Sequence, residues 1–446
     1  MNILFISLGC DKNLCDSEYM LSKLDKAGHV IVDNEDDADI VVINTCAFIC
    51  DAKEESINNI LEMAELKKQG KIKHIIVAGC LSERYKDDML EEIPEIDAII
   101  GTTAVDKISE AIENVINSSN NKEYFMPLDT KAEYDETGRF VTTGGHFAYL
   151  KIAEGCDKHC TYCIIPSLRG SYRSVPMERL ISDAKDLVNK GVSELILVAQ
   201  ETTVYGTDLY GKKMLPALLD ELNKIEDLKW IRLLYAYPEE IDLELIEAIK
   251  RNEKVLHYID MPIQHINDTV LKLMGRRTTG SDIADIIELL REHIPDICIR
   301  TSLITGFPGE TDEMHEELLS FINWAEFDRL GCFTYSPEEG TAAINLPGQI
   351  DEEVKKQRQS EIMELQQEIS LDLNEKLTGS VMTAFVEGYI PEEDIYIART
   401  FRDAPGVDGQ LFINSDKPLN SGDFVEVKIT EAAEYDLIGE LLNESA

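Results

Sequence analysis

The 446-residue sequence lacks any long hydrophobic run, which excludes a membrane-spanning helix. No stretch of about 18 apolar residues occurs, whereas a helix needs about 20 to cross a bilayer. The N-terminal segment MNILFISLGC also lacks the basic region that opens a secretory signal peptide, and its pattern is that of a buried strand. We therefore expect a cytoplasmic protein with no membrane partner.

Positive charge is the second shortage. The chain carries 43 Lys and Arg against 85 Asp and Glu, a formal net charge of −42. Such a surface repels polyanions, including tRNA, and attracts basic proteins. Direct nucleic-acid binding is therefore not expected to dominate. A generally acidic proteome or a need for solubility explains the same excess equally well.

The N-terminal part of the chain alternates short apolar runs with amphipathic stretches. The runs NILFISLG, DIVVIN, HIIVAG and IDAIIG are typical of buried parallel strands. This alternation predicts a doubly wound α/β domain over residues 1–120. A linker is predicted over 121–141, where Pro and Gly interrupt the pattern.

Two further domains are predicted beyond the linker. Residues 142–375 contain six strand-like runs, namely AYLKIAEG, ELILVA, WIRLLY, LHYIDM, CIRTSLIT and RLGCFTY, with helical segments between them. Six β/α units are too few for an eightfold barrel, so an open six-unit β/α barrel is predicted. Residues 376–446 contain five short alternating runs separated by Gly, Pro and Asp, which predict a small five-stranded β-barrel.

Cys156, Cys160 and Cys163 form a Cys-x-x-x-Cys-x-x-Cys motif after the predicted strand AYLKIAEG. In a long cytoplasmic chain, clustered cysteines indicate metal or redox chemistry rather than disulfides. Thiolates are the usual ligands of iron–sulfur clusters, and three of them leave one iron of a 4Fe–4S cube open for a chelating substrate. The alternatives are a zinc site that also uses His159, and unrelated thiols.

A second set of cysteines is dispersed along the N-terminal domain. Cys10, Cys46 and Cys80 each follow a predicted strand, in SLGC, INTC and VAGC. Loops after the strands of an open α/β sheet converge on one crevice, so these thiols are candidate ligands of a second cluster. Buried cysteines are also common as small hydrophobic residues, and this is the alternative.

Several motifs resemble those of the methylthiotransferases, a family of the radical S-adenosylmethionine superfamily. SLGCDKNLCDSE, NTCAFICDAKEES and AGCLSERY resemble its N-terminal domain, and IAEGCDKHCTYCIIPSLRG resembles its radical S-adenosylmethionine loop. The C-terminal barrel is similar to the TRAM domain, the substrate-binding module of the family. The resemblance covers nearly the whole chain.

The resemblance implies two 4Fe–4S clusters and S-adenosylmethionine as cofactors. The cluster on Cys156, Cys160 and Cys163 would cleave S-adenosylmethionine to methionine and a 5′-deoxyadenosyl radical, which would take a hydrogen from the substrate. A sulfur species on the other cluster would be delivered as a methylthio group, with its methyl from a second S-adenosylmethionine. Because an unactivated aliphatic C–H has no usable acidity, this chemistry belongs to the cofactors, and no side chain is a certain catalytic residue.

Five residues are candidates for binding S-adenosylmethionine. Tyr162 precedes the last cysteine of the loop, while Gln200 and Glu201 follow the strand ELILVA and would meet the amine or ribose of the cofactor. Glu201 stands where Asp is usual in the family. Gly306 and Glu310 lie in TSLITGFPGET, at the strand end with which the superfamily contacts adenosine. An ordinary strand–helix turn is the alternative there.

The substrate is expected to be a protein. LGCDKNLCDSE, VAQETTVYG, RLLYAYPEEI and YIDMPIQH resemble the RimO-type branch, which modifies the β-carbon of an aspartate in small-subunit ribosomal protein S-twelve. The alternative is the MiaB-type branch, which modifies an adenosine of tRNA. Residues 376–446 contain 5 basic and 14 acidic residues, whereas an RNA-binding barrel should carry a basic face.

Composition thus favours the ribosomal protein, free or in the ribosome, as the partner. A flavodoxin or ferredoxin is the reductant expected for this class. An iron–sulfur electron carrier without catalysis is a hypothesis from another class, and it leaves the six-unit barrel unexplained.

The remaining cysteines are predicted to be structural. Cys15 and Cys50 lie near the ligand motifs but off the family positions, and Cys298 and Cys332 fall within predicted strands. His265 is a candidate for contact with the substrate, although a lone histidine is more often structural.

Overall fold

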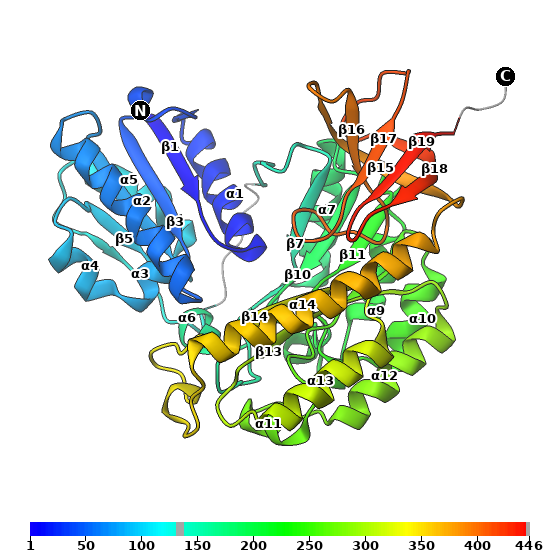
Figure 1. Cartoon of the computed structure of the whole chain (residues 1–446). Helices are drawn as coiled ribbons and strands as arrows, with labels where there is room; N and C mark the ends of the chain where they lie inside the picture. The colour runs from blue at the N-terminus through cyan, green and yellow to red at the C-terminus, as the bar shows by residue number, and fades with distance from the viewer. Residues whose placement is uncertain (131–137, 443–446) are drawn as a thin grey trace.

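A computed structural model describes residues 1–130 and 138–442. Part of the predicted linker (131–137) and the end of the predicted C-terminal domain (443–446) lie outside the described residues. Three regions follow one another along the chain: an N-terminal sheet domain, a central open barrel and a small C-terminal barrel (Figure 1).

The N-terminal region is a parallel six-stranded sheet with helices on both faces. Its order is β2-β1-β3-β4-β5-β6, and the strands are β1 (Asn2–Ser7), β2 (Val30–Val32), β3 (Ile40–Thr45), β4 (His74–Gly79), β5 (Ala98–Ile100) and β6 (Glu123–Tyr124). All six residues of β3, IVVINT, are buried, as expected of a central strand that helices cover on both sides. β6 falls within the predicted linker and extends the sheet by pairing with β5.

The helices of this domain divide between the two faces of the sheet. One face is covered by α1 (Asp11–Lys26) and α5 (Ile108–Ile116), and the other by α2 (Cys50–Lys68), α3 (Cys80–Arg84) and α4 (Lys86–Glu92). Two short 3-10 turns, η1 (Glu35–Asp37) and η2 (Val105–Lys107), complete the connections. The predicted doubly wound α/β architecture is confirmed.

The central region is an open barrel of six parallel strands in chain order. They are β7 (Phe147–Lys151), β10 (Glu194–Val198), β11 (Trp230–Leu233), β12 (Val255–Asp260), β13 (Cys298–Thr305) and β14 (Arg329–Thr334). Each strand pairs with the next in parallel register, and β7 and β14 form the two edges of the sheet. The predicted six-unit open barrel is confirmed.

Helices pack on the outside of the open barrel. The larger ones are α7 (Met177–Asn189), α9 (Leu215–Leu222), α10 (Leu243–Arg251), α12 (Gly280–His293), α13 (Asp312–Ala325) and α14 (Glu352–Glu375). Shorter elements are α6 (Ile165–Arg169), α8 (Thr207–Tyr210), α11 (Asp268–Leu273), η3 (Pro238–Glu240), η4 (Ala343–Asn345) and the antiparallel pair of two-residue strands β8 (Ala153–Glu154) and β9 (Arg173–Ser174). α14 packs along the edge strand β14 and leads into the C-terminal barrel (Figure 1).

The C-terminal region is a closed five-stranded barrel of order β15-β16-β17-β19-β18. Its strands are β15 (Val381–Ile390), β16 (Ile395–Arg399), β17 (Leu411–Asn414), β18 (Phe424–Ala432) and β19 (Leu437–Leu441). Closure leaves no free edge that another chain could pair with. The prediction of a small five-stranded barrel is confirmed.

The C-terminal barrel packs against the inner face of the open barrel. Outward side chains of the central strands meet the helices, whereas inward side chains such as Ile196, Trp230 and Tyr258 form a separate core with Phe385 and Ala404. The loop 400–408 after β16 supplies much of this contact. Its backbone and carboxylates accept hydrogen bonds from arginines of the central strands, including those from Arg232 and Arg329.

Candidate active site

The loop with Cys156, Cys160 and Cys163 lies beyond the C-terminal end of β7. The Thr161 N–H donates to the Met274 carbonyl at 2.9 Å, which ties the loop to α11. Each thiol lies within electrostatic reach of the others, and burial raises the pKa of Cys156 to about 11 and that of Cys163 to about 12. Binding of iron must therefore displace protons from these thiols.

Cys10, Cys46 and Cys80 lie together at one edge of the N-terminal sheet. They follow the neighbouring strands β1, β3 and β4, and Cys80 opens α3. A Cβ on Gly9 would lie 2.7 Å from the Cβ of Cys46, so these two loops touch. The Ser56 hydroxyl on α2 accepts from the Cys46 N–H and donates to the Cys46 carbonyl, both at 3.0 Å, which fixes the second loop.

The thiols of both cysteine sets are suitable ligands for an iron–sulfur cluster. Five of the six thiols are buried or half-buried, and Cys10 is exposed. Within residues 1–130 and 138–442, no group of three or more His, Cys, Asp or Glu side chains converges so as to hold a metal ion. A 4Fe–4S cube binds each cysteine to a different iron, so its ligands surround the cube instead of meeting at one point.

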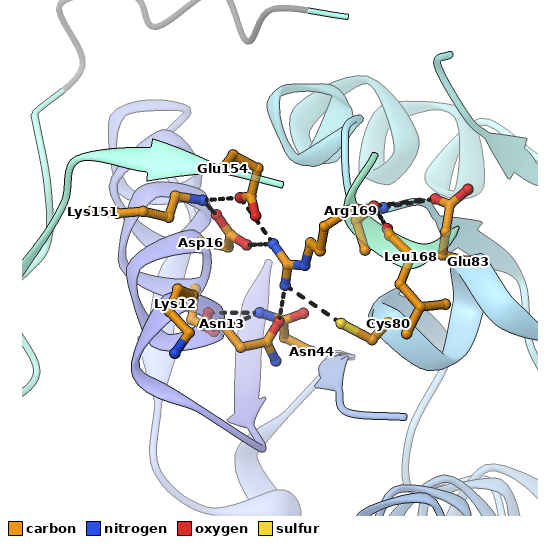
Figure 2. Close-up of polar contacts among 12 residues, drawn as sticks. Lys12, Asn13, Asp16, Asn44, Cys80, Glu83, Lys151, Glu154, Leu168 and Arg169 are labelled. Carbon is orange, nitrogen blue, oxygen red and sulfur yellow. Dashed lines mark hydrogen bonds and ion pairs between the residues drawn. The ribbon is translucent and has the colours of Figure 1, made fainter. Parts of the chain in front are cut away.

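Arg169 joins the second cysteine set to the central barrel (Figure 2). Its Nη2 lies 3.5 Å from Cys80 Sγ, and its Nη1 donates to Glu154 at 3.1 Å. Glu154 also accepts from Gln200 at 2.8 Å. Burial opposes the charged form of Glu154, but Arg169 and Lys151 hold the pKa of that carboxyl well below its usual range. Polar contacts therefore run without a break from Cys80 to the end of β10.

A second connection runs through the end of β11. The Tyr237 hydroxyl lies 3.9 Å from Cys160 Sγ. Two residues earlier, the Tyr235 ring centroid lies 3.4 Å from Nζ of Lys12, and Lys12 is two residues beyond Cys10. The two cysteine sets therefore face one interface, where the ends of the N-terminal strands meet the mouth of the open barrel.

Three of the predicted cofactor-binding residues lie in or beside the first cysteine loop. Glu201 is 2 % exposed, and burial raises its pKa to about 7 even though Lys158 lies 3.4 Å away. Gln200 Oε1 is buried and has no hydrogen-bond partner among the described residues. Tyr162 packs edge-on against Phe307 at 6.3 Å between ring centroids.

The two predicted residues of the GFPGE turn are engaged by the turn itself and by helix α14. Glu310 accepts from the Phe307 N–H at 3.0 Å and pairs with Arg358 at 3.1 Å. A Cβ on Gly306 would lie 2.3 Å from Cγ of Lys355 on α14. These contacts match the ordinary-turn alternative. Contact between the backbone of this turn and adenosine stays a prediction.

Comparison with family models divides the chain into three matches. Residues 2–101 match the uncharacterized protein family UPF0004, residues 150–322 match the radical SAM superfamily, and residues 378–442 match the TRAM domain. A protein of Lachnoclostridium phytofermentans named ribosomal protein uS12 methylthiotransferase RimO is 56% identical over 439 residues, 98% of this chain and 99% of that protein.

The chain belongs to the uS12 methylthiotransferase family.

A second family member, from Acetivibrio thermocellus, carries the same name and is 50% identical over 446 residues, 99% of this chain and 98% of its own. The methylthiotransferase predictions of enzyme class, iron–sulfur clusters and S-adenosylmethionine are thereby confirmed. These relatives carry the name of the ribosomal-protein branch, so the tRNA alternative is not favoured.

Solved structures share the fold of this methylthiotransferase at low sequence identity. The radical S-adenosylmethionine methyltransferase TsrM from Kitasatospora setae matches with a TM-score of 0.55 and 12% identity, covering 86% of this chain and 80% of its own. The cobalamin-dependent S-adenosylmethionine radical enzyme OxsB matches with a TM-score of 0.51 and 14% identity, covering 81% and 56%. At such identities the likeness shows the fold alone.

Three residues of the methylthiotransferase site were not predicted from the sequence. Arg169 carries no local signal, because it ends a one-turn helix and most of its contacts lie in another domain. Tyr235 and Tyr237 alternate just beyond β11, in LLYAYP. Two tyrosines directly after a barrel strand, where barrel enzymes place their sites, are the signal that could have found them.

Three of the other cysteines and His265 lie within the packing of the methylthiotransferase, whereas the expectation of a spare structural thiol is wrong for Cys50. Cys15 is buried in α1, and Cys298 and Cys332 are buried in β13 and β14. Cys50 is exposed at the start of α2. His265 is 0 % exposed and accepts from the Asn267 N–H through Nδ1 at 3.0 Å, which fits the structural alternative.

Proposed function

We propose that the chain adds a methylthio group to the β-carbon of an aspartate in ribosomal protein uS12, the small-subunit protein S-twelve. The observation that carries the proposal is the meeting of two three-cysteine sets across one domain interface, with Arg169 and Tyr235 bridging it. The name of the full-length relatives supports the substrate.

The six cysteines divide into two ligand sets in this proposal. Cys156, Cys160 and Cys163 hold the cluster that works with S-adenosylmethionine, and the set at Cys10, Cys46 and Cys80 holds the second cluster. When bound, the clusters and S-adenosylmethionine supply radical and sulfur chemistry that no side chain offers. The protein contributes position and exclusion of water.

The residues near the first set match the polar groups of S-adenosylmethionine. Its amine is a hydrogen-bond donor, and Gln200 Oε1 is a buried acceptor without a partner in the described part of the chain. Glu201 adds a second acceptor at the same strand end. Tyr162, within the loop, packs its aromatic ring against Phe307. We assign these three residues to the cofactor.

The partners and location follow from the substrate. A basic ribosomal protein suits a chain of net charge −42, because complementary charge speeds encounter. We propose uS12, free or in the ribosome, as the protein partner and a flavodoxin or ferredoxin as the reductant, which places the enzyme in the cytoplasm. In residues 1–130 and 138–442, no helix has the length and apolar character needed to cross a bilayer.

The test is mass spectrometry after anaerobic incubation of the reconstituted chain with S-adenosylmethionine, sulfide, dithionite and either uS12 or tRNA. We expect a methylthio adduct on one aspartate of uS12 and none on tRNA. Cys46→Ala should abolish the adduct, and Cys15→Ala, a buried cysteine outside both sets, should retain it. An adduct on tRNA adenosine, with none on uS12, would overturn the proposal.

A further inference from the structure

Arg169 is a buried guanidinium that crosses from one domain into another (Figure 2). Its side chain is 2% exposed. Nη1 donates to Asp16 of α1 at 2.6 Å, and Nη2 donates to Asn13 Oδ1 at 3.0 Å and lies 3.5 Å from Cys80 Sγ. Four acceptors on three segments therefore fix this guanidinium when the Glu154 contact is included.

The short helix α6 holds Arg169 in place. It starts two residues after Cys163, so it continues directly from the first cysteine loop. The Thr102 hydroxyl of the N-terminal domain donates to the Leu168 carbonyl at 2.6 Å. Ile164 and Leu168 also pack in the core beneath that sheet. The backbone beside Arg169 is therefore anchored independently of its guanidinium.

The charges around Arg169 compensate one another. Arg169 and Lys151 face the carboxylates of Asp16 and Glu154, and Lys151 contacts both acids. The set is neutral overall. What reaches the Cys80 sulfur is therefore a directed N–H group rather than an excess of positive charge.

We propose that Arg169 is a positioning residue for the second cluster, whose Nη2–H donates to the ligand sulfur of Cys80 and raises the reduction potential of that cluster. The inference rests on the proposed assignment of Cys80 as a ligand. Hydrogen bonds to ligand sulfurs are one of the levers that set cluster potentials. A reduced cluster carries more negative charge on its sulfurs, so the donor stabilises the reduced state more than the oxidised state.

The same side chain couples the tuning to the docking of the two domains. Glu154 accepts from both Arg169 and Gln200, so a shift of the N-terminal domain would disturb the donor to Cys80 and the side chain at the end of β10 together. The second cluster reaches its working potential only when the N-terminal domain is docked on the open barrel as in this structure.

The test is a redox titration of the second cluster, followed by electron paramagnetic resonance. The full-length chain carries Cys156, Cys160 and Cys163 replaced by Ala, so that a single cluster contributes, and dithionite supplies the electron. Arg169→Lys keeps the charge but cannot reach all four acceptors. We expect it to lower the ratio of reduced to oxidised cluster about tenfold at a fixed potential, which is about 59 mV for one electron.

Asp16→Asn is the matched control. It breaks the ion pair across the same interface but leaves Nη2 facing Cys80, so it should lower the melting temperature without lowering the potential. An unchanged potential in Arg169→Lys at full iron content would overturn the inference and leave the proposed function intact. A chain that holds no iron in this background would overturn the second cluster itself.

A measurement on the wild-type residue covers the case in which Arg169→Lys does not fold. With ¹⁵N-arginine incorporated, pulsed electron paramagnetic resonance of the reduced second cluster should show a ¹⁵N coupling that Asp16→Asn retains. Absence of that coupling would also overturn the inference.

Discussion

The ammonium of Lys12 lies 3.4 Å from the centroid of the Tyr235 ring, across the interface between the N-terminal domain and the open barrel. Burial opposes the charge, yet Asp11 and Tyr235 hold the pKa of Lys12 well above its usual value. Tyr235 has φ of +61°, a conformation that non-glycine residues adopt at a cost of about 1 kcal/mol or more. Its tertiary contacts maintain that conformation.

Replacement of Tyr235 by Leu should destabilise the apoprotein by about 1–2 kcal/mol, because a desolvated cation–π contact is lost. Tyr235→Phe keeps the ring and should cost less. Urea unfolding measures both. Tyr435→Leu, at a tyrosine that is 37% exposed, is the control and should stay within about 0.5 kcal/mol. Equal effects at the two tyrosines would contradict a role for the ring at the interface.

Iron content tests the two ligand sets directly. The reconstituted wild-type chain should hold about eight irons, four for each cluster. Cys46→Ala should hold about four, and Cys15→Ala should hold the wild-type amount because its thiol packs against the Tyr149 carbonyl outside both sets. Full iron in Cys46→Ala would remove that residue from the second cluster.

Replacement of Glu194 by Gln should weaken the attachment of the C-terminal barrel to the central strands. Glu194 is 0 % exposed and accepts from Arg232 at 2.8 Å and Arg399 at 2.7 Å. Loss of its charge leaves Arg232 buried without a carboxylate partner and Arg399 with Glu387 alone, which costs about 3–5 kcal/mol. Hydrogen exchange in strands β15 to β19 should rise. Glu387→Gln, which also contacts Arg399 but is 21% exposed, should have a much smaller effect.

His265 predicts a pH dependence of stability. Burial lowers the pKa of His265 to about 3, against about 6.5 in an unfolded chain. The unfolded state therefore binds a proton between these values that the folded state does not, and stability falls as pH drops from about 6.5 toward 3. Between pH 6.5 and 5.5 this loss approaches about 1 kcal/mol. The free energy of unfolding of His265→Asn, measured with urea, should not show this loss. The same dependence on pH in the variant and the wild type would contradict the assignment.

Gly306→Ala should destabilise the chain more than a matched glycine substitution. Gly306 has φ of +69°, and its Cβ would lie 2.3 Å from Cγ of Lys355, whereas Gly211 has φ of +71° and nothing within 4 Å. Gly211→Ala isolates the backbone cost, about 1 kcal/mol. In thermal unfolding, the melting temperature of Gly306→Ala should lie well below that of Gly211→Ala. Equal melting temperatures would show that α14 yields to the methyl group.

Local pattern was sufficient to predict the three architectures. The apolar run of β3 and the alternating runs of the C-terminal barrel encode strands directly, and the position of a cysteine after each of β1, β3 and β4 follows from parallel sheet geometry. Contacts between domains could not be predicted this way. Arg169 finds its acceptors on α1, α3 and β8, and no periodicity within its own segment encodes a partner more than 80 residues away.

Glu310 illustrates the opposite difficulty. Its position in a Gly-Phe-Pro-Gly-Glu turn is compatible with ligand binding and with turn stabilisation, and only the location of Arg358 on the distant helix α14 reveals the acid's partner. The sequence shows which residues are chemically capable, whereas tertiary structure determines which of them are already engaged.

The loop 400–408 has a practical consequence for dissecting the enzyme. It covers the inner face of the open barrel and receives hydrogen bonds from Arg232, Arg300 and Arg329. Truncation of the chain before residue 376 would leave these arginines without their acceptors and would expose the apolar inner face of the central sheet to solvent. Loss of activity in a truncated protein would therefore be explained equally well by unfolding of the central barrel and by loss of the substrate-binding domain. Point substitutions on the outer surface of the small barrel are the cleaner way to map how substrate is held.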